Sequence, residues 1–487
     1  MVKHPHPVLG GAPLVIYITH AYTKQGKSLV GFFVYRHLGL VGCNIGLMKR
    51  LLPLLLPILF LIYWSCEDEQ DFYPTMIADG YLDKISYHVG DKAKLYINAV
   101  EEVKNGVINV RDITGEKIDR ILCHLQPQTI TNLEPWKDGC GYNASCTYEI
   151  PNLPSGIYEL DNSGIFFIIK TNEQVDAVVV YPSNTLNAYS VAGGKSLYKP
   201  TGDRAQQVSF LRPMTTWSGH WRPIFEWLKT QTQYNLGYIS DMDLDDYAEI
   251  DKSSLLVITG HSEYWTRKAR ENFDQFVDLG NDAMVLSGNS MWWQVRYDSS
   301  KTQLVCYKGS PEDPLDETEL ESVRWIEPQL NYPIIKSIGA DFDRGGFGTN
   351  HGYGLGGYKI VANNSPLLEG LYFSQGDILY ISTNEYDGAP INGFDESGFP
   401  VIDKELLGFF QIELIGFDRP VNRFGVPGVG TFIVFQKKED SGIVINAASM
   451  NWGGKNGMEG PDKDKIKHIT TNMFNKLLNK ESIFTNL

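Results

Sequence analysis

The stretch LLVITGHSEYWT, residues 255–266, decides the fold class that the sequence predicts. Its first half is a continuous apolar run with the length of a buried strand. Its second half places His261, Glu263, Tyr264 and Trp265 directly after that strand. Reactive side chains in this position are typical of a parallel sheet whose ligands bind beyond the carboxyl ends of its strands.

Strand and helix patterns alternate around this stretch. Apolar runs predict strands and amphipathic segments predict helices. In chain order the segments are AVVVYPS (177–183), PIFEWLKTQTQ (223–233), LGYISDMDL (236–244), TRKARENFDQFVDLG (266–280) and AMVLSGNS (283–290). Strands separated by single helices imply right-handed crossovers and parallel pairing. We therefore expect residues 176–487 to form an α/β domain of three layers with a mainly parallel sheet, either glutamine-amidotransferase-like or Rossmann-like.

Residues 76–175 have a different pattern, in which short apolar or alternating segments are separated by turn residues. The segments are KAKLYINAV (92–100), GVINVRDI (106–113), CTYEIPNL (146–153) and GIFFIIKTN (164–172). This pattern predicts a small all-β sandwich. A sandwich by itself carries no function, so two interpretations stay open. It is either a module that binds carbohydrate or protein, or a spacer packed against the next domain.

The first 66 residues have the layout of an export signal preceded by an extension. From Met48, Lys49 and Arg50 are followed by an uncharged, mostly apolar run that ends at Ser65-Cys66. That order predicts a lipoprotein signal at 48–66, lipidation of Cys66 and an acidic tether at 67–75. A signal anchor or a buried core helix are the alternatives. Residues 1–47 contain no acidic residue and are interpreted as an extension from a misassigned start. The predicted location is the bacterial cell envelope, lipid-anchored at the outer-membrane surface.

Charge and cysteine usage restrict the remaining classes. The formal net charge of −15 disfavours a phosphate backbone as a partner, so we expect no nucleic acid. No Cys/His spacing typical of structural zinc occurs. In an oxidising compartment Cys140 and Cys146 could close the loop CGYNASC, with Cys123 as a competing partner.

Several common catalytic motifs are absent. GGKS at 193–196 lacks the first glycine of a P-loop, and neither G-x-S-x-G nor H-E-x-x-H occurs. The glycine-rich segment 342–358 has no placement suited to a dinucleotide fingerprint. It predicts a long surface loop, with a lid as its functional interpretation.

Polar or aromatic residues follow four of the predicted strands. They are Tyr189, the pair Asp241 and Asp243, the 261–265 cluster, and Asn289. All could line one crevice at the sheet edge. The alternative is that His261 caps the following helix and Glu263 lies in its first turn.

Short stretches from about 176 to 480 resemble the catalytic C-terminal region of the N,N-dimethylformamidase large subunit. The stretches are TLNAYSVAGGKSLY (185–198), Arg212-Pro213, TGHSEYW (259–265), LSGNSMWW (286–293) and NEYDG (384–388). Together they cover most of the strand ends that the pattern predicts.

The resemblance implies a mononuclear ferric ion, Fe(III), held by two tyrosines and one glutamate. The matching positions are Tyr189, Tyr198 and Glu263 as metal ligands. It also implies catalytic or substrate-orienting roles for His261, Asn289 and Glu385, and a small partner subunit. Three anionic oxygen ligands suit a hard trivalent cation better than zinc. Open coordination positions could polarise an amide carbonyl and acidify a water.

We therefore expect a surface-anchored, metal-dependent hydrolase of an amide or related C–N bond, with a small amide-type substrate. The competing hypothesis is a non-catalytic or carbohydrate-binding envelope lipoprotein that uses the same domain as a scaffold for a glycan. A thiol-dependent hydrolase is disfavoured, because only Cys306 among the cysteines falls at a predicted strand end. The sequence leaves an oligomeric state open.

Overall fold

The computed structural model describes residues 17–22, 28–33, 77–199, 202–214 and 220–485. Residues 1–71 and 72–487 form two separate compact units. In the first unit, strands β1 (Tyr17–Tyr22) and β2 (Ser28–Phe33) pair antiparallel. Cys66, the predicted signal and the predicted tether lie outside the described residues. Within the described part of the chain, no helix has both the length and the apolar character needed to cross a bilayer.

Residues 77–169 form two β-sheets that share one core. The three-stranded sheet contains β3 (Ile77–Leu82), β5 (Lys92–Ala99) and β8 (Cys146–Glu149). The five-stranded sheet has the order β4 (Ser86–Tyr87), β10 (Phe166–Ile169), β9 (Gly156–Leu160), β6 (Val103–Asp112) and β7 (Lys117–Leu125). Leu95 and Ile97 of β5 pack with Val110 and Phe167 of the other sheet, and all four are fully buried.

A disulfide joins Cys123 of β7 to Cys146 of β8 and so connects the two sheets. The pairing of Cys140 with Cys146 that the short loop suggested is therefore wrong, and the competing partner Cys123 is correct. Cys140 is a free, buried thiol. The choice depends on which strands face each other across the core, and loop length does not determine that.

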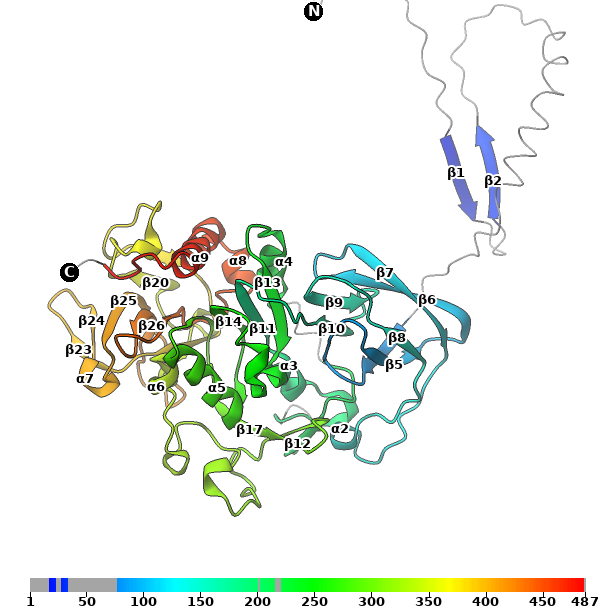
Figure 1. Cartoon of the computed structure of the whole chain (residues 1–487), viewed down its shortest axis with the longest axis horizontal. Coiled ribbons are helices and arrows are strands. Elements are labelled where there is room, and N and C mark those ends of the chain that lie inside the picture. The colour runs from blue at the N-terminus through cyan, green and yellow to red at the C-terminus, as the bar shows by residue number, and fades with distance from the viewer. Residues whose placement is uncertain (1–16, 23–27, 34–76, 200–201, 215–219, 486–487) are drawn as a thin grey trace, which may run out of the picture. The chain divides into compact units, whose positions relative to one another are not determined.

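The rest of the chain is organised around a nine-stranded sheet (Figure 1). Its order is β13 (Leu236–Ser240), β11 (Ala177–Tyr181), β14 (Leu255–Gly260), β16 (Asp282–Ser287), β27 (Ile443–Asn446), β26 (Gly430–Gln436), β25 (Gln411–Asp418), β20 (Gly357–Ile360) and β21 (Ile378–Tyr380). The strands from β13 to β27 pair in parallel. Every pairing from β27 to β21 is antiparallel.

The predicted three-layer, Rossmann-like domain with a mainly parallel sheet is therefore wrong. The sheet is mixed, and smaller sheets accompany it. These are β12 (Gln207–Ser209), β18 (Gln303–Val305), β17 (Trp293–Tyr297) and β15 (Tyr264–Thr266), then β19 (Asp341–Phe347) with β22 (Glu385–Gly388), and β23 (Ile391–Phe394) with β24 (Pro400–Ile402). The strand–helix alternation stops after residue 290, and the following strands pair mainly antiparallel without long intervening helices.

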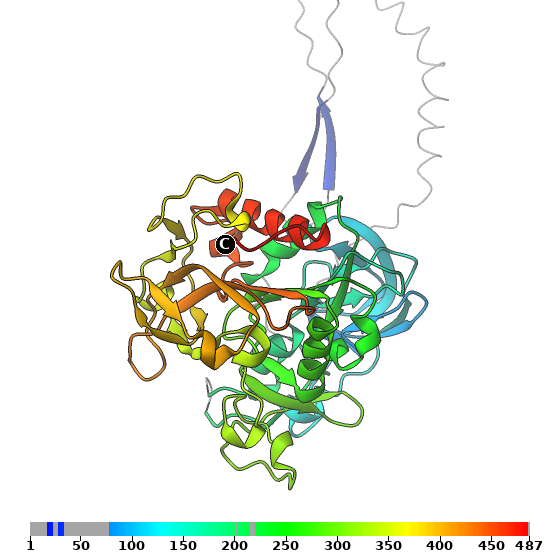
Figure 2. The same cartoon turned by 60° about the vertical axis from the view of Figure 1, so that its left-hand side comes forward.

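Only a few helices of the described chain lie against the nine-stranded sheet, some on each face (Figures 1 and 2), and the chain remains mostly β. α4 (Arg222–Thr230) and α9 (Lys463–Leu478) pack in the same core as Val179 and Val257. α5 (Arg267–Asp278) and α6 (Ile335–Ile338) pack in the core that contains the alternate residues Val180 and Ile258. Successive strand residues point to opposite faces, so a strand buried on both faces must be apolar throughout.

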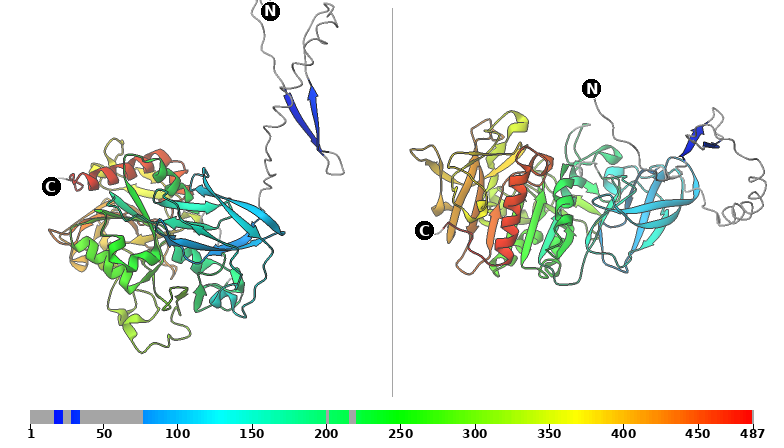
Figure 3. Two further views of the ribbon diagram at one scale, coloured as in Figure 1. Left: turned by 45° about the vertical axis from the view of Figure 1, so that its right-hand side comes forward. Right: turned by 90° about the horizontal axis from the view of Figure 1, so that it is seen from above.

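The remaining short helices lie in connections. They are α2 (Pro135–Asp138), α3 (Ser183–Tyr189), α7 (Lys404–Leu407) and α8 (Lys455–Met458). β13 is the edge strand of the nine-stranded sheet and contacts β9 and β10 (Figure 3). The β region 77–169 thus packs against the rest of the second unit at that edge.

The glycine-rich segment 342–358 is a loop only in part. Residues 342–347 belong to β19, which pairs with β22, residues 357–358 belong to β20, and the connection 348–356 between them contains no strand. A Cβ on Gly345 would lie 2.1 Å from the carbonyl oxygen of Tyr386. Glycine is required there because the two backbones approach too closely for any side chain.

Candidate active site

Three parallel strands place four of the six predicted site residues at one edge of the sheet. β11 leads into α3, whose last residue is Tyr189. β14 is followed directly by His261 and Glu263, and β16 is followed by Asn289. Because β11, β14 and β16 are adjacent and parallel, their carboxyl ends lie side by side.

Both predicted tyrosine ligands converge on the Glu263 carboxylate. The Tyr189 hydroxyl donates to Oε2 of Glu263 at 3.1 Å. The Tyr198 hydroxyl lies 2.9 Å from each carboxylate oxygen of Glu263. The two phenol rings stack with centroids 4.2 Å apart. The tyrosines are partly buried and the Glu263 side chain is almost fully buried, so the carboxylate lies behind the phenols.

His261 lies beside this cluster with its two ring nitrogens in different roles. Its Nδ1 lies 3.0 Å from the carbonyl oxygen of Gly288, which can only accept, so Nδ1 carries the proton. Its Nε2 lies 3.3 Å from both the Tyr189 hydroxyl and Oε2 of Glu263. Oε2 of Glu385 lies 3.6 Å from the same nitrogen. The imidazole therefore stands between the two carboxylates.

Asn289 connects the end of β16 to Glu385, the first residue of β22. Its Nδ2 donates to Oε2 of Glu385 at 3.1 Å, and its backbone is in the left-handed region at φ 52°. The preceding Gly288 permits this approach. A Cβ there would lie 2.4 Å from the amide nitrogen of Met450 and 2.7 Å from the carbonyl oxygen of Glu385. All six predicted residues are thus brought together.

The charges of the cluster differ between its two carboxylates. Burial alone would raise the pKa of Glu263, but His261, Lys308 and Tyr198 hold it below its ordinary value. Burial raises the pKa of Glu385, and the Glu263 charge adds to that rise. Burial lowers the pKa of His261, yet the two carboxylates outweigh burial and raise it to about 9. Glu263 is thus kept ionised, whereas Glu385 accepts a proton more readily than an ordinary glutamate.

Burial also raises the pKa values of Tyr189 and Tyr198 well above the ordinary value, and the Glu263 charge raises them further. Both phenols are therefore neutral at physiological pH while no cation is bound, and both can donate to Glu263. Only a strongly acidic cation could displace their protons.

The prediction gives no role to three residues in contact with this cluster, although one of them, Tyr264, belongs to the 261–265 stretch. The Trp293 indole donates to Oε1 of Glu263 at 3.0 Å. The Tyr264 hydroxyl donates to that of Tyr198 at 2.8 Å, and Nζ of Lys308 donates to Tyr264 at 2.7 Å. Tyr264 and Trp293 belong to stretches that carry the resemblance. Lys308 lies in a loop after β18, where no sequence signal indicates a role.

Other residues considered at the strand ends have different functions. Asp241 accepts the backbone N–H of Asn184 at 2.8 Å. Asp243 accepts hydrogen bonds from the amide and the hydroxyl of Ser240. The side chain of Thr266, not His261, caps α5 by accepting from the amide of Ala269. The interpretation of His261 as a helix cap is therefore wrong.

The loop that carries Tyr189 and Tyr198 is held by a buried arginine. Arg212 donates to the carbonyl oxygens of Asn187, Ala192, Lys195 and Ser209 at 2.7–3.0 Å. Its side chain is fully buried, so these bonds replace its hydration. A planar guanidinium can satisfy several carbonyls of one loop at once. Arg212 thereby fixes the chain on both sides of the tyrosines.

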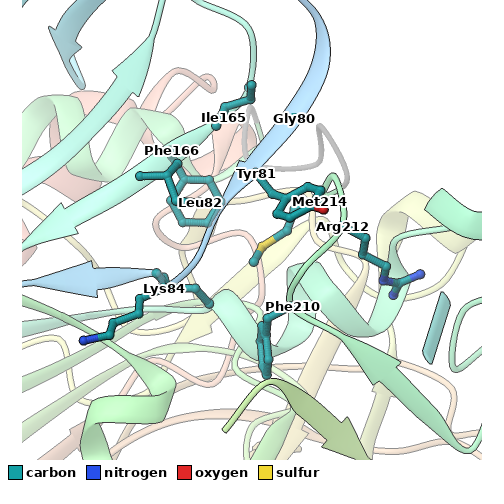
Figure 4. A pocket seen from close by; sticks show the side chains of 11 residues that line it. Gly80, Tyr81, Leu82, Lys84, Ile165, Phe166, Phe210, Arg212 and Met214 are labelled. Atoms are coloured by element: carbon teal, nitrogen blue, oxygen red, sulfur yellow. The ribbon is translucent and has the colours of Figure 1, made fainter. Parts of the chain in front are cut away.

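A separate cavity of about 30 Å³ lies next to Arg212 (Figure 4). Tyr81 and Leu82 of β3, Phe166 of β10 and Met214 contribute to its lining. None of the six predicted site residues lines it. Its small volume and mainly apolar walls make it a packing feature between the β region and the 210–214 segment.

The donor chemistry at Glu263 fits a ferric ion. Across the described ranges, no group of three or more His, Cys, Asp or Glu side chains is placed to hold a metal ion. The candidate set instead has two phenol oxygens and one carboxylate within hydrogen-bonding distance of one another. Three hard anionic oxygens would neutralise a trivalent cation. Tyr189, Tyr198 and Glu263 are therefore the residues that would hold such an ion.

The fold and the cluster together define a protein with a phenol–carboxylate site at the edge of a mixed sheet. The chain belongs to the family described as N,N-dimethylformamidase beta subunit-like, C-terminal, which matches residues 111–462. No curated protein matches the chain in sequence. One solved structure that it resembles is described as a putative ThuA-like protein from Bacteroides uniformis ATCC 8492. That likeness has 10% identity and a TM-score of 0.34, and covers 64% of this chain and 94% of that one.

Proposed function

We propose that this protein is a metal-dependent hydrolase that cleaves an amide or a related C–N bond, with one Fe(III) held by Tyr189, Tyr198 and Glu263. The observation that carries the proposal is the convergence of both phenol hydroxyls on one buried carboxylate, at 2.9–3.1 Å. A site built only for packing has no need to collect these oxygens beside an imidazole and a second carboxylate. Membership of the dimethylformamidase-like family supports the same proposal.

A trivalent ion bound there would supply Lewis acidity to an amide carbonyl and to a water molecule. The chain's own groups would manage the protons. Glu385 is the least buried of the three acid–base groups, with a side chain 16% exposed against 3% for both His261 and Glu263. Its raised pKa suits a group that takes a proton from water at Oε2 and returns it to the leaving amine.

His261 and Asn289 would position that carboxylate and the substrate. Asn289 already donates to the Oε2 atom of Glu385, which fixes the direction of its lone pairs. The Nε2–H of a protonated His261 faces the cluster, where it could stabilise an oxyanion. Tyr189 and Tyr198 are only partly buried, so a small amide could reach the site past their rings.

The proposal includes a location outside the cytoplasm, with Cys66 lipidated and the protein anchored to the envelope. This part depends on the sequence from Met48 to Cys66 alone. A partner subunit or a homo-oligomer is compatible with it. The net charge of −15 continues to disfavour nucleic acid.

The decisive test combines metal content with turnover. Protein that contains residues 67–487 is reconstituted with Fe(III), and iron is counted per chain. We expect about one iron per chain with a tyrosinate-to-iron charge-transfer band, and release of an amine from at least one member of a panel of small formamides and acetamides. Replacing Tyr189 by Phe should weaken the band, and the matched Tyr148→Phe change in β8 should not.

Absence of iron binding and of the band would refute the ligand assignment. Iron binding without turnover of any amide would contradict the hydrolase proposal and indicate a metal-binding scaffold. The competing glycan-binding hypothesis would then be examined on a glycan array.

A further inference from the structure

Lys308 and Tyr264 form an ordered hydrogen-bond chain that ends at the Tyr198 oxygen. Nζ of Lys308 lies 2.7 Å from the Tyr264 hydroxyl, which lies 2.8 Å from the Tyr198 hydroxyl. The Tyr264 ring is fully buried, whereas Lys308 is partly buried. Both hydroxyls therefore have hydrogen-bond partners within the cluster.

The direction of this chain follows from counting protons. An ammonium group has donors and no acceptor, so Tyr264 must accept from Lys308. The single hydroxyl proton of Tyr264 is then free to donate to Tyr198. Tyr198 in turn donates its own proton to Glu263. When Tyr198 loses that proton to become an anionic ligand, the donor from Tyr264 remains in place.

Lys308 also places its charge directly over the phenol that would be ionised. Its Nζ lies 3.7 Å from the centroid of the Tyr198 ring and 4.7 Å from that of Trp293. The Trp293 indole donates to Oε1 of Glu263, so the lysine packs against one proposed ligand, Tyr198, and against a residue that contacts another, Glu263. The cation–π contact therefore restrains the Tyr198 ring, while Tyr264 restrains its hydroxyl.

We propose that Tyr264 and Lys308 are positioning residues that hold the Tyr198 ring and oxygen beside Glu263, and that they thereby set how tightly the site holds iron. The inference rests on the proposed function, since it presupposes Tyr198 as an iron ligand. It also explains why a partly buried lysine lies against three aromatic rings and donates its hydrogen bond to a phenol. Groups that hydrogen-bond to a metal ligand typically change metal affinity by about 10- to 100-fold when removed.

The test measures the iron site itself in full protein from residue 67. The variants are Tyr264→Phe, which removes the donor and keeps the ring, and Lys308→Met, which removes the charge and keeps most of the stem. Each should bind iron about tenfold more weakly in competition with citrate. Each should also shift the tyrosinate-to-iron band to longer wavelength, because an iron-bound phenolate gives up electron density more easily without its hydrogen-bond donor or without the cation over its ring. Lys308→Arg should restore the wild-type band.

Two controls separate this role from general destabilisation. Tyr148→Phe removes a hydroxyl that donates to Asp119 at 2.7 Å in the β region, and Lys437→Met removes a partner of Asp274 at 2.6 Å. Both should lower the melting temperature without moving the band.

The outcomes distinguish the two proposals. A wild-type protein with an iron band, together with variants whose band and iron affinity are unchanged, would overturn the role of Tyr264 and Lys308 and leave the proposed function standing. A wild-type protein that binds no iron would overturn both. If Tyr264→Phe fails to fold, the Lys308→Met and Lys308→Arg pair decides.

Discussion

At the scale of single residues, two glutamates in one cluster have opposite electrostatic environments. Glu263 accepts hydrogen bonds from two phenols and an indole, and these donors favour its ionised form. Glu385 accepts a hydrogen bond from the side chain of Asn289 and lies next to the Glu263 charge. The same side chain is therefore suited to ligation at one position and to proton transfer at the other.

Exchanging each carboxylate for an amide should separate these roles. Glu263→Gln should lose iron and activity together, because the site loses one of three anions. Glu385→Gln should keep the iron and lower the turnover of an amide substrate by about 10²- to 10⁴-fold, the usual contribution of one general acid or base. Iron content and single-turnover amine release measure the two effects. Equal iron retention in both variants would contradict the division of roles.

At the scale of elements, the site depends on a short helix and the loop after it. α3 has seven residues, and Tyr189 is its last. Tyr198 follows in irregular chain, where no strand or helix fixes it. The carbonyls of this segment are tied to Arg212, so one buried side chain replaces the regular backbone pairing that a longer element would provide.

Arg212→Lys should therefore loosen the two tyrosines. A lysine ammonium is a point donor and cannot span the same carbonyls. We expect a lower melting temperature and iron affinity reduced by about tenfold. Arg270→Lys is the matched control, because Arg270 is equally buried and donates to the carbonyls of Tyr332 and Pro333, away from the tyrosines. Equal loss of iron affinity in the two variants would count against the role of Arg212.

At the scale of the whole molecule, an ionic cluster joins the β region to the mixed sheet. Lys170, after β10, lies 2.9 Å from Asp243 and also pairs with Glu249. Lys252 lies 2.6 Å from Glu249. Burial would raise the pKa of Glu249, but the two lysines hold it at about 2. Breaking this cluster would leave buried charges without partners.

The cluster predicts a specific pH dependence of stability. Because the pKa of Glu249 is depressed on folding, its contribution is present above its ordinary value of 4.5 and is lost as the pH falls towards 2. Glu249→Gln should cost about 2 kcal/mol at pH 7, and the difference from wild type should shrink between pH 4.5 and pH 2.5. Urea unfolding across this range measures it. Glu369→Gln, which removes an exposed carboxylate that pairs with Lys476, should give a much smaller difference.

Anchoring also concerns the whole molecule, and its prediction depends on the sequence alone. Protein expressed from Met48 should incorporate labelled lipid and fractionate with membranes. Cys66→Ala should remove both properties, because the thiol is the attachment point. Equal labelling of the two proteins would contradict the lipoprotein interpretation.

The sequence by itself determined the elements from 177 to 290 and the residues at their ends. β11, β14 and β16 and the helices α4 and α5 lie where the apolar periodicity predicts them. That prediction succeeds because strand and helix patterns are local, and because the end of a strand is visible as the point where its apolar run stops. Tyr189, His261, Glu263 and Asn289 could be placed at one edge for this reason. Tyr198 and Glu385 came from the resemblance.

Only the tertiary structure decided the rest, since it depends on contacts between distant segments. In the antiparallel half of the sheet, β26 pairs with β25 on one side and with β27 on the other. The apolar runs of these strands do not indicate whether a strand pairs parallel or antiparallel. Cys123 rather than Cys140 meets Cys146 because two sheets face each other. Lys308 contacts Tyr264, which lies 44 residues earlier in the chain, and no local sequence pattern predicts that contact. The spacing of apolar residues indicates which side chains are buried. Which other side chains they contact is determined only by how the chain packs.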